Sequence, residues 1–169
     1  ANLITGAENT MLFIFNAVRK TVNWNEQEAI FIDNNINQTW QKKTGNSASL
    51  NLLLIKLLTD AGLKALPVLF STRDNGLVNS HYPFLNQFNT VMTFVVIADK
   101  SFVLDATDKI SNYKLIPEKV VNSPGFIIEG ESGRWRNFIA GDYKYKMTVA
   151  VRGEIDSTGT MKGNGLVSC

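Results

Sequence analysis

The fold of this chain is decided by the stretch Thr44-Gly-Asn-Ser-Ala-Ser-Leu-Asn-Leu-Leu-Leu-Ile-Lys-Leu-Leu58. Its first residues are small and polar, and such side chains accept hydrogen bonds from the free N–H groups that begin a helix. From Leu50 onward the stretch is apolar on nearly every side, which is typical of a helix buried inside a protein. Gly62 follows, and glycine favours the left-handed conformation that ends many helices. We therefore predict a central buried helix whose N-terminus lies at 46–49.

Helical periodicity precedes this helix, and strand-like patterns follow it. Apolar residues between Thr10 and Val22 recur at helical spacing, and a second, short helix is expected near 36–40. After Gly62, β-rich runs predict strands, and Asp99-Lys100 predicts a tight hairpin between the last two of them. The runs are Leu66 to Ser71, Val91 to Ala98 and Phe102 to Leu104, with a long loop over 72–83. Helices followed by an antiparallel meander indicate an α+β fold.

The residue pattern along the sequence changes after Pro124, and we predict a domain boundary at residue 128. Residues 1–128 are expected to form the core domain. Residues 129–169 are expected to be the start of a β-rich C-terminal module that this sequence truncates. Within that part, 142–151 and 153–168 predict a hairpin whose turn is Asp156-Ser-Thr-Gly159.

The composition favours a packed domain and argues against two kinds of partner. Of the 169 residues, 44% are hydrophobic and 19% are charged, which supplies a core and is atypical of a disordered chain. The net charge is +2 without a basic cluster, so we expect no nucleic-acid partner. The local run Lys144-Tyr-Lys146 is interpreted as a solvated strand face. Apolar stretches such as Leu52 to Ile55 are far shorter than the ~20 residues of a membrane span, so none is expected.

Cysteine and histidine each occur once, as Cys169 and His81. A single cysteine forms no intrachain disulfide, and the two residues cannot assemble a Cys/His zinc site. Cysteine catalysis would need the terminal residue, where chains are usually poorly ordered. We therefore expect no metal and no cofactor, and the composition argues against a cysteine nucleophile.

Four segments, taken in order and spacing, resemble the transglutaminase-like domain of the papain-like cysteine-hydrolase superfamily. They are Lys43-Thr-Gly-Asn-Ser-Ala-Ser-Leu-Asn51, Leu57-Leu-Thr-Asp-Ala-Gly-Leu-Lys-Ala-Leu-Pro67, Asn86-Gln-Phe-Asn-Thr-Val91 and Val103-Leu-Asp-Ala-Thr-Asp108. The resemblance spans roughly residues 10–128 and is closest to a bacterial branch in which this domain lies between β-rich modules. It implies a papain-like core, a central buried helix against an antiparallel sheet.

The resemblance also implies where the catalytic residues of the family would fall. Its cysteine starts the central helix, its histidine starts a neighbouring strand, and its aspartate follows on the next strand. These positions are Ser47, Thr90 and Asp105 in this chain, so only the aspartate is retained. Serine is a weaker acid than cysteine and needs a base, and the threonine hydroxyl accepts no proton near neutral pH.

The chain is therefore expected to be a pseudoenzyme, with no catalytic residue. We expect a binding or scaffold module that takes an unknown protein, peptide or glycan ligand beside the flanking domains of the same polypeptide. The resemblance alone implies an extracytoplasmic location, periplasmic or secreted, in bacteria.

Two other hypotheses stay open. The first is a serine-type peptidase or amide hydrolase that uses Ser47, His81 and Asp105, with the loop of His81 folded back over the helix end. The second is a spacer between β modules, which predicts a cleft filled by side chains.

Four further residues have both a functional and a structural interpretation. Asp108 stands three residues after Asp105 and could pair with it for acid–base work or cation binding, but such a spacing more often organises a turn. Arg73 could bind an anion, although an ion pair is more common. Trp24 and Trp40 could line a groove, although packing is the usual role of such side chains.

Overall fold

The computed structural model describes residues 2–82, 84–141 and 148–168. Three helices come first, α1 (Asn2–Thr21), α2 (Ile36–Lys42) and α3 (Ser47–Asp60), and two-residue strands β1 (Asn23–Trp24) and β2 (Thr44–Gly45) pair in parallel between them. An antiparallel five-stranded sheet of order β5-β4-β3-β6-β7 follows. Its strands are β3 (Lys64–Phe70), β4 (Thr90–Ile97), β5 (Lys100–Leu104), β6 (Ser123–Glu129) and β7 (Ser132–Phe138). Short 3-10 turns are η1 (Arg73–Asn75), η2 (Leu85–Gln87) and η3 (Glu118–Val120). The α+β class is confirmed.

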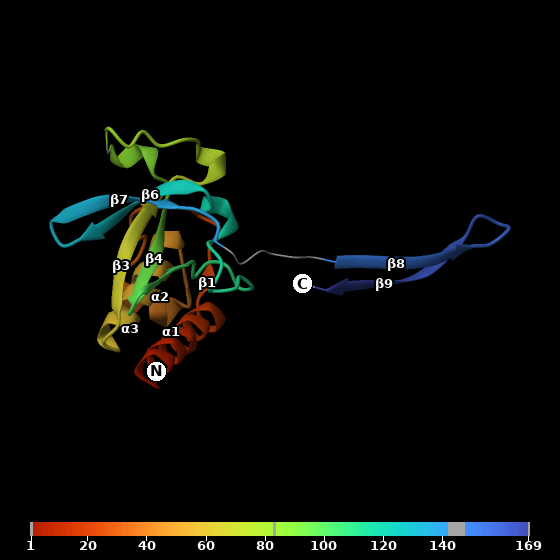
Figure 1. Ribbon diagram of the computed structural model, residues 1–169, viewed down its shortest axis with the longest axis horizontal. Coiled ribbons are helices and arrows are strands. Elements are labelled where there is room, and N and C mark those ends of the chain that lie inside the picture. Colours follow the sequence, from red (N-terminus) through yellow and green to blue (C-terminus); the bar gives the residue numbers. More distant parts are fainter. Residues whose placement is uncertain (1, 83, 142–147, 169) are drawn as a thin grey trace.

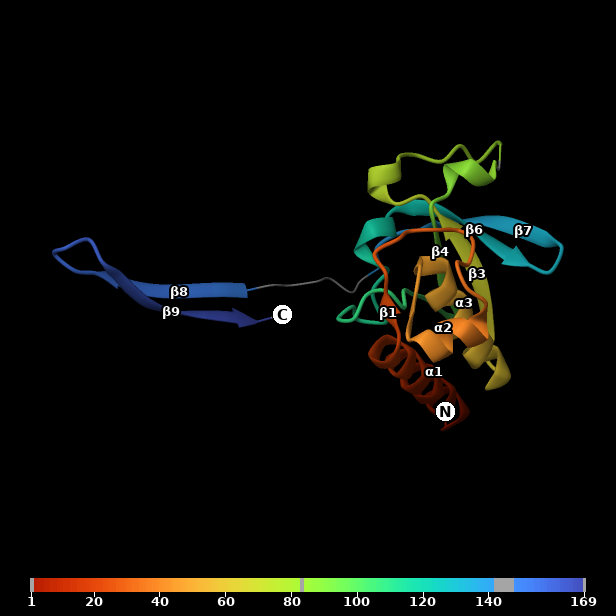
Figure 2. The same cartoon turned by 180° about the vertical axis from the view of Figure 1, so that it is seen from behind.

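Helix α3 is the central element, as predicted from its sequence. The Asn46 side chain caps it by accepting a hydrogen bond from the Ser49 N–H. At the other end Gly62 has a φ of 81°, and the N–H groups of Gly62 and Leu63 donate to the carbonyls of Thr59 and Leu58. This is the paired arrangement that closes many helices. Figures 1 and 2 show the three helices gathered on one side of the sheet.

The sheet has two buried faces, and alternate residues of each strand belong to different ones. On β4, Val91 and Val95 pack with the helices, whereas Met92 and Phe94 pack in a second cluster on the opposite face. Strand β7 lies across this second face. There the Arg136 guanidinium lies over the Phe94 ring and donates to the Ser101 hydroxyl of β5 at 2.9 Å. The sheet is therefore coiled, because its two edge strands approach each other.

The β4–β5 hairpin turns one residue earlier than its sequence predicted. Ile97 pairs with Lys100, so the turn is Ala98-Asp99 and Lys100 already belongs to β5. Ala98 takes a positive φ of 51°, which tight hairpin turns require. This shift matters because one residue of register decides which side chains face the helix.

The sheet continues beyond residue 128, where we expected a domain boundary. Residue 128 lies within β6, and β7 completes the sheet as far as Phe138. Phe138 is 4% exposed, and its ring packs edge-on against Phe70 at 5.0 Å between centroids. The residues up to 138 thus contribute to the core. A second β-rich module stays a prediction.

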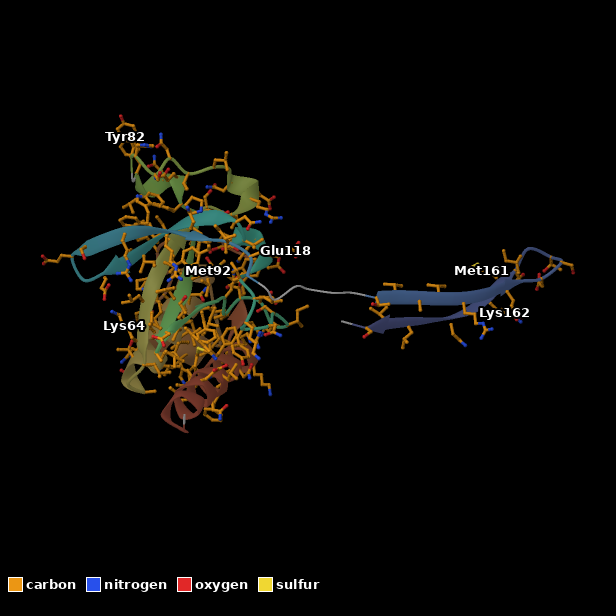
Figure 3. All side chains as sticks on the ribbon, in the orientation of Figure 1. Lys64, Tyr82, Met92, Glu118, Met161 and Lys162 are labelled. Atoms are coloured by element: carbon orange, nitrogen blue, oxygen red, sulfur yellow. The ribbon has the colours of Figure 1, made fainter. Side chains whose placement is uncertain are left out.

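The C-terminal residues form a separate hairpin of β8 (Thr148–Ile155) and β9 (Met161–Ser168). The turn follows Ile155 and includes Asp156 and Gly159, close to the prediction. Every residue of both strands is exposed, and side chains such as Met161 and Lys162 project to opposite sides of the ribbon (Figure 3). Residues 142–147, where the hairpin was expected to begin and which include the run Lys144-Tyr-Lys146, lie outside the described residues.

Replacing Phe138 by alanine tests whether β7 belongs to the core. We expect Phe138→Ala to lower the free energy of unfolding by about 3–5 kcal/mol, because a fully packed ring is removed from between two others. Chemical denaturation would measure it. Ile139→Ala is the matched control, since Ile139 is 68% exposed and should change little. A loss below about 1 kcal/mol in Phe138→Ala would contradict the assignment of β7 to the core.

Candidate functional site

Ser47 begins α3, but its hydroxyl is buried and already bonded. The side chain is fully buried, and its Oγ accepts a hydrogen bond from the Ala29 N–H at 2.8 Å and donates to the Ala29 carbonyl at 3.1 Å. The Ser47 N–H donates to the Gln27 carbonyl at 3.0 Å. A hydroxyl held on both sides by one backbone residue is a structural bridge. It is not exposed to a substrate.

Residues 25–33, which we call the covering segment, lie across the beginning of α3. The Asn46 amide donates to the Phe31 carbonyl at 2.8 Å. The Ser49 hydroxyl, three residues after Asn46, donates to Asp33 Oδ1 at 2.6 Å, and the Asp33 N–H donates to the same hydroxyl at 3.3 Å. The covering segment therefore supplies partners for Asn46, Ser47 and Ser49 at the start of the helix.

The Asp33 carboxylate is the charged end of the covering segment. Partial burial raises the pKa of Asp33, but the hydrogen bonds from Ser49, from the backbone and from Asn34 outweigh it and hold the pKa below its ordinary value. The charged form is therefore the one that stabilises this contact.

Asp105 lies deep in the protein, directly after β5, and is linked to α3 through Asn51. Its Oδ1 accepts hydrogen bonds from Asn51 Nδ2 at 3.2 Å, from the Thr107 N–H at 3.0 Å and from the Thr107 hydroxyl at 2.8 Å. The same Asn51 amide donates to the Ser47 carbonyl at 3.1 Å. Two of the three positions implied by the resemblance, Ser47 and Asp105, are thus joined by one intervening side chain.

Lys119 forms an ion pair with Asp105. Its ammonium nitrogen lies 2.8 Å from Asp105 Oδ2 and 2.5 Å from Oε1 of Glu28, which belongs to the covering segment. Burial lowers the pKa of Lys119, but Asp105 and Glu28 outweigh that effect and raise the pKa above its ordinary value. The charged neighbour of Asp105 is therefore the Lys119 ammonium group.

Thr90, the position implied for the histidine, begins β4. It pairs with Phe70, which packs on the face of the sheet away from the helices. The next residue, Val91, packs with Ala48 of α3 instead. Since neighbouring residues of a strand point to opposite faces, the Thr90 side chain points away from the start of α3. It is buried, and no hydrogen bond to its hydroxyl occurs within the described residues.

His81 is exposed in the long loop between β3 and β4. The His81 backbone N–H donates to Asn79 Oδ1 at 3.0 Å within the same loop. The Ser47 hydroxyl, by contrast, is buried on the Ala29 backbone. The structure therefore does not bring His81 and Ser47 together into the rearranged triad.

The remaining candidates take local structural roles. The Asp108 carboxylate accepts hydrogen bonds from the N–H groups of Ile110 and Ser111, which organises a turn. Arg73 is exposed in η1. The Trp24 ring N–H donates to the Gln27 carbonyl, and the Lys43 ammonium lies 3.9 Å from the centroid of the Trp40 ring. Cys169 lies outside the described residues.

Two kinds of site are not found in the part of the chain that the structure describes. No group of three or more His, Cys, Asp or Glu side chains there is placed to hold a metal ion. No helix among those residues combines the length and apolar character needed to cross a bilayer.

A scan against models of known protein families gave no match, and searches of curated proteins and of solved structures gave none either.

Lys119 and Glu28 had no signal in the sequence that pointed to this site. Glu28 precedes Lys119 by 91 residues and lies outside helices and strands, whereas Lys119 lies in the short 3-10 turn η3. Asn51 is a polar residue in an otherwise apolar helix, and that interruption is the one pattern that could have indicated a buried polar contact.

Replacing Asp33 by asparagine tests the contact between the covering segment and α3. The folded pKa is lowered, so the stabilisation is present above the unfolded pKa of about 4 and is lost as the pH falls through the lower folded value. We therefore expect Asp33→Asn to destabilise the protein at pH 7 and the difference from the unmodified chain to shrink at low pH. Denaturation at several pH values would measure this.

The Ser49→Ala variant provides the matched comparison. It removes the partner of the same hydrogen bond, so the double variant should lose little more stability than either single variant. Fully additive losses would show that Asp33 and Ser49 do not act through one contact.

Proposed function

We propose that this chain is a non-catalytic domain of papain-like, transglutaminase-type architecture that acts as a binding or scaffold module. The observation that carries the proposal is the burial of the Ser47 hydroxyl on Ala29 beneath the covering segment. A nucleophile must be accessible to its substrate and have a base within hydrogen-bond reach. Ser47 has neither an open approach nor an imidazole beside it.

The surroundings of Asp105 support the same conclusion. In a working triad the aspartate orients the base that activates the nucleophile. Here the charged neighbour of Asp105 is the Lys119 ammonium, whose pKa is raised, so it remains protonated and does not act as a base at neutral pH. The Thr90 side chain points to the other face of the sheet. Asp105 thus binds Lys119 and the Thr107 backbone, and it does not orient a base.

The architecture is compatible with the resemblance. A buried helix starts at the small polar stretch, packs on an antiparallel sheet and is followed by strands in the order that the resemblance implies. The coiled sheet, with Arg136 of β7 reaching Ser101 of β5, is a further point of similarity to a papain-like core.

The loop between β3 and β4 is the surface through which we propose that the module binds its partner. It exposes apolar side chains, and the rings of Tyr82 and Phe84 stack with their centroids 6.2 Å apart. Tyr82 lies far from the helices (Figure 3). Exposed stacked aromatics suit a protein, peptide or glycan ligand. We place the module in a larger extracytoplasmic bacterial protein, beside further domains of the same polypeptide.

A thiol placed at residue 47 tests whether the helix start is covered. In a Cys169→Ser background, we expect the thiol of Ser47→Cys to react with a maleimide at least about 100-fold more slowly than an exposed thiol, which corresponds to an opening free energy near 3 kcal/mol. Ser80→Cys, in the exposed loop, is the matched control. Both thiols should react equally fast in denaturant.

Rapid labelling of Ser47→Cys in the folded protein would contradict the covered site. Labelling of Ser47 by a fluorophosphonate in the unmodified chain, lost in His81→Ala, would instead support the serine hydrolase.

A further inference from the structure

Lys119, Asp105 and Glu28 come from three separate segments and meet at one point. The Lys119 ammonium nitrogen lies 2.8 Å from Asp105 Oδ2 and 2.5 Å from Glu28 Oε1. The side chains of Lys119, Glu28 and Asp105 are 28%, 24% and 1% exposed. We propose that Lys119 and Asp105 become joined by an amide bond, an intramolecular isopeptide cross-link, with Glu28 as the proton shuttle.

One oxygen of the Asp105 carboxyl group, Oδ1, is surrounded by hydrogen-bond donors. Oδ1 accepts three hydrogen bonds, from Asn51 Nδ2 and from the N–H and hydroxyl of Thr107. When an amine adds to the carboxyl carbon, negative charge develops on an oxygen, and donors that are already in place stabilise it. Oδ1 is that oxygen.

The other carboxyl oxygen, Oδ2, is suited to leave. It is buried, and within the described residues it has no hydrogen bond of good geometry. Its close neighbour is the Lys119 nitrogen at 2.8 Å, so the nucleophile lies on the side of the departing oxygen.

Glu28 supplies the proton transfer that the reaction needs. Its Oε1 contacts the Lys119 nitrogen, whereas Oε2 is buried without a hydrogen-bond partner among the described residues. The contact of Oε1 with the ammonium nitrogen places Glu28 to accept a proton from it and to return that proton later. The centroid of the Trp24 ring lies 5.5 Å from the Lys119 ammonium nitrogen.

The reaction balances without a further reactant. Glu28 accepts one proton from the ammonium, and the neutral nitrogen forms a bond to the carboxyl carbon of Asp105. The bond from that carbon to Oδ2 then breaks. Oδ2 leaves as water with two of the three ammonium protons, one of them returned through Glu28, and the third stays on the amide nitrogen. Because the ammonium form dominates before reaction, the bond forms slowly relative to folding.

Mass spectrometry of the intact folded chain tests the proposal directly. After incubation for several days at pH 7–8, we expect a mass lower than that of the sequence by one water. A tryptic digest should then contain one product that joins residues 101–109 to residues 115–134, because trypsin does not cleave after a modified lysine.

The chain contains its own matched control. Lys56 and Asp60 form an ion pair of 2.9 Å, but both side chains are more than half exposed, so their tryptic peptides should stay unmodified. Lys119→Arg keeps the positive charge but forms no such amide and should have the full mass. Glu28→Gln should slow the loss of water at least about tenfold, as for removal of a general base.

Two results would overturn the proposal. One is a full sequence mass with separate peptides after incubation, which would leave Lys119 and Asp105 as an ion pair only. The other is a loss of water confined to one peptide, which marks cyclisation at an aspartate rather than a cross-link. Since both are measured on the unmodified chain, neither depends on the folding of a variant.

Discussion

Helix α3 begins inside the protein, so its first N–H groups and polar side chains must find partners within the chain. Asn46 satisfies part of this need as the cap, and the covering segment satisfies the rest through Ala29 and Asp33. In an open active site, solvent or substrate would share these groups. Here the chain itself occupies them, and the helix start becomes part of the core. The burial of the Ser47 hydroxyl follows from this constraint.

The same covering segment reaches the other polar centre of the fold. Glu28 contacts Lys119, Lys119 contacts Asp105, and Asp105 is bonded through Asn51 to the Ser47 carbonyl. These contacts form a polar network that connects helix α3, the end of β5 and the covering segment. Buried charges contribute little net stability on average but are costly to leave unpaired. The main effect of this polar network is therefore to fix one arrangement of the segments, and its contribution to the free energy of unfolding is small.

Much of the architecture could be predicted from the sequence because it depends on local patterns. The polar start and apolar body of α3, the turn residues and the β-rich runs each act within a few positions. The face that Thr90 occupies could not be predicted, because nearly every residue of β4 is buried and the strand shows no alternation that marks its helix-facing side. Neither could the contact of Glu28 with Lys119, which joins the covering segment to the 3-10 turn η3 and depends on tertiary packing.

Amide hydrogen exchange at Ala29 and Ser47 is the most direct test of the central claim, that the covering segment is an integral part of the helix start. Both N–H groups donate hydrogen bonds across this contact. We expect both to exchange as slowly as amides in the interior of α3, through the same opening of the structure. Exchange at the rate of the exposed loop around Asn79 would contradict it, because the helix start would then open on its own.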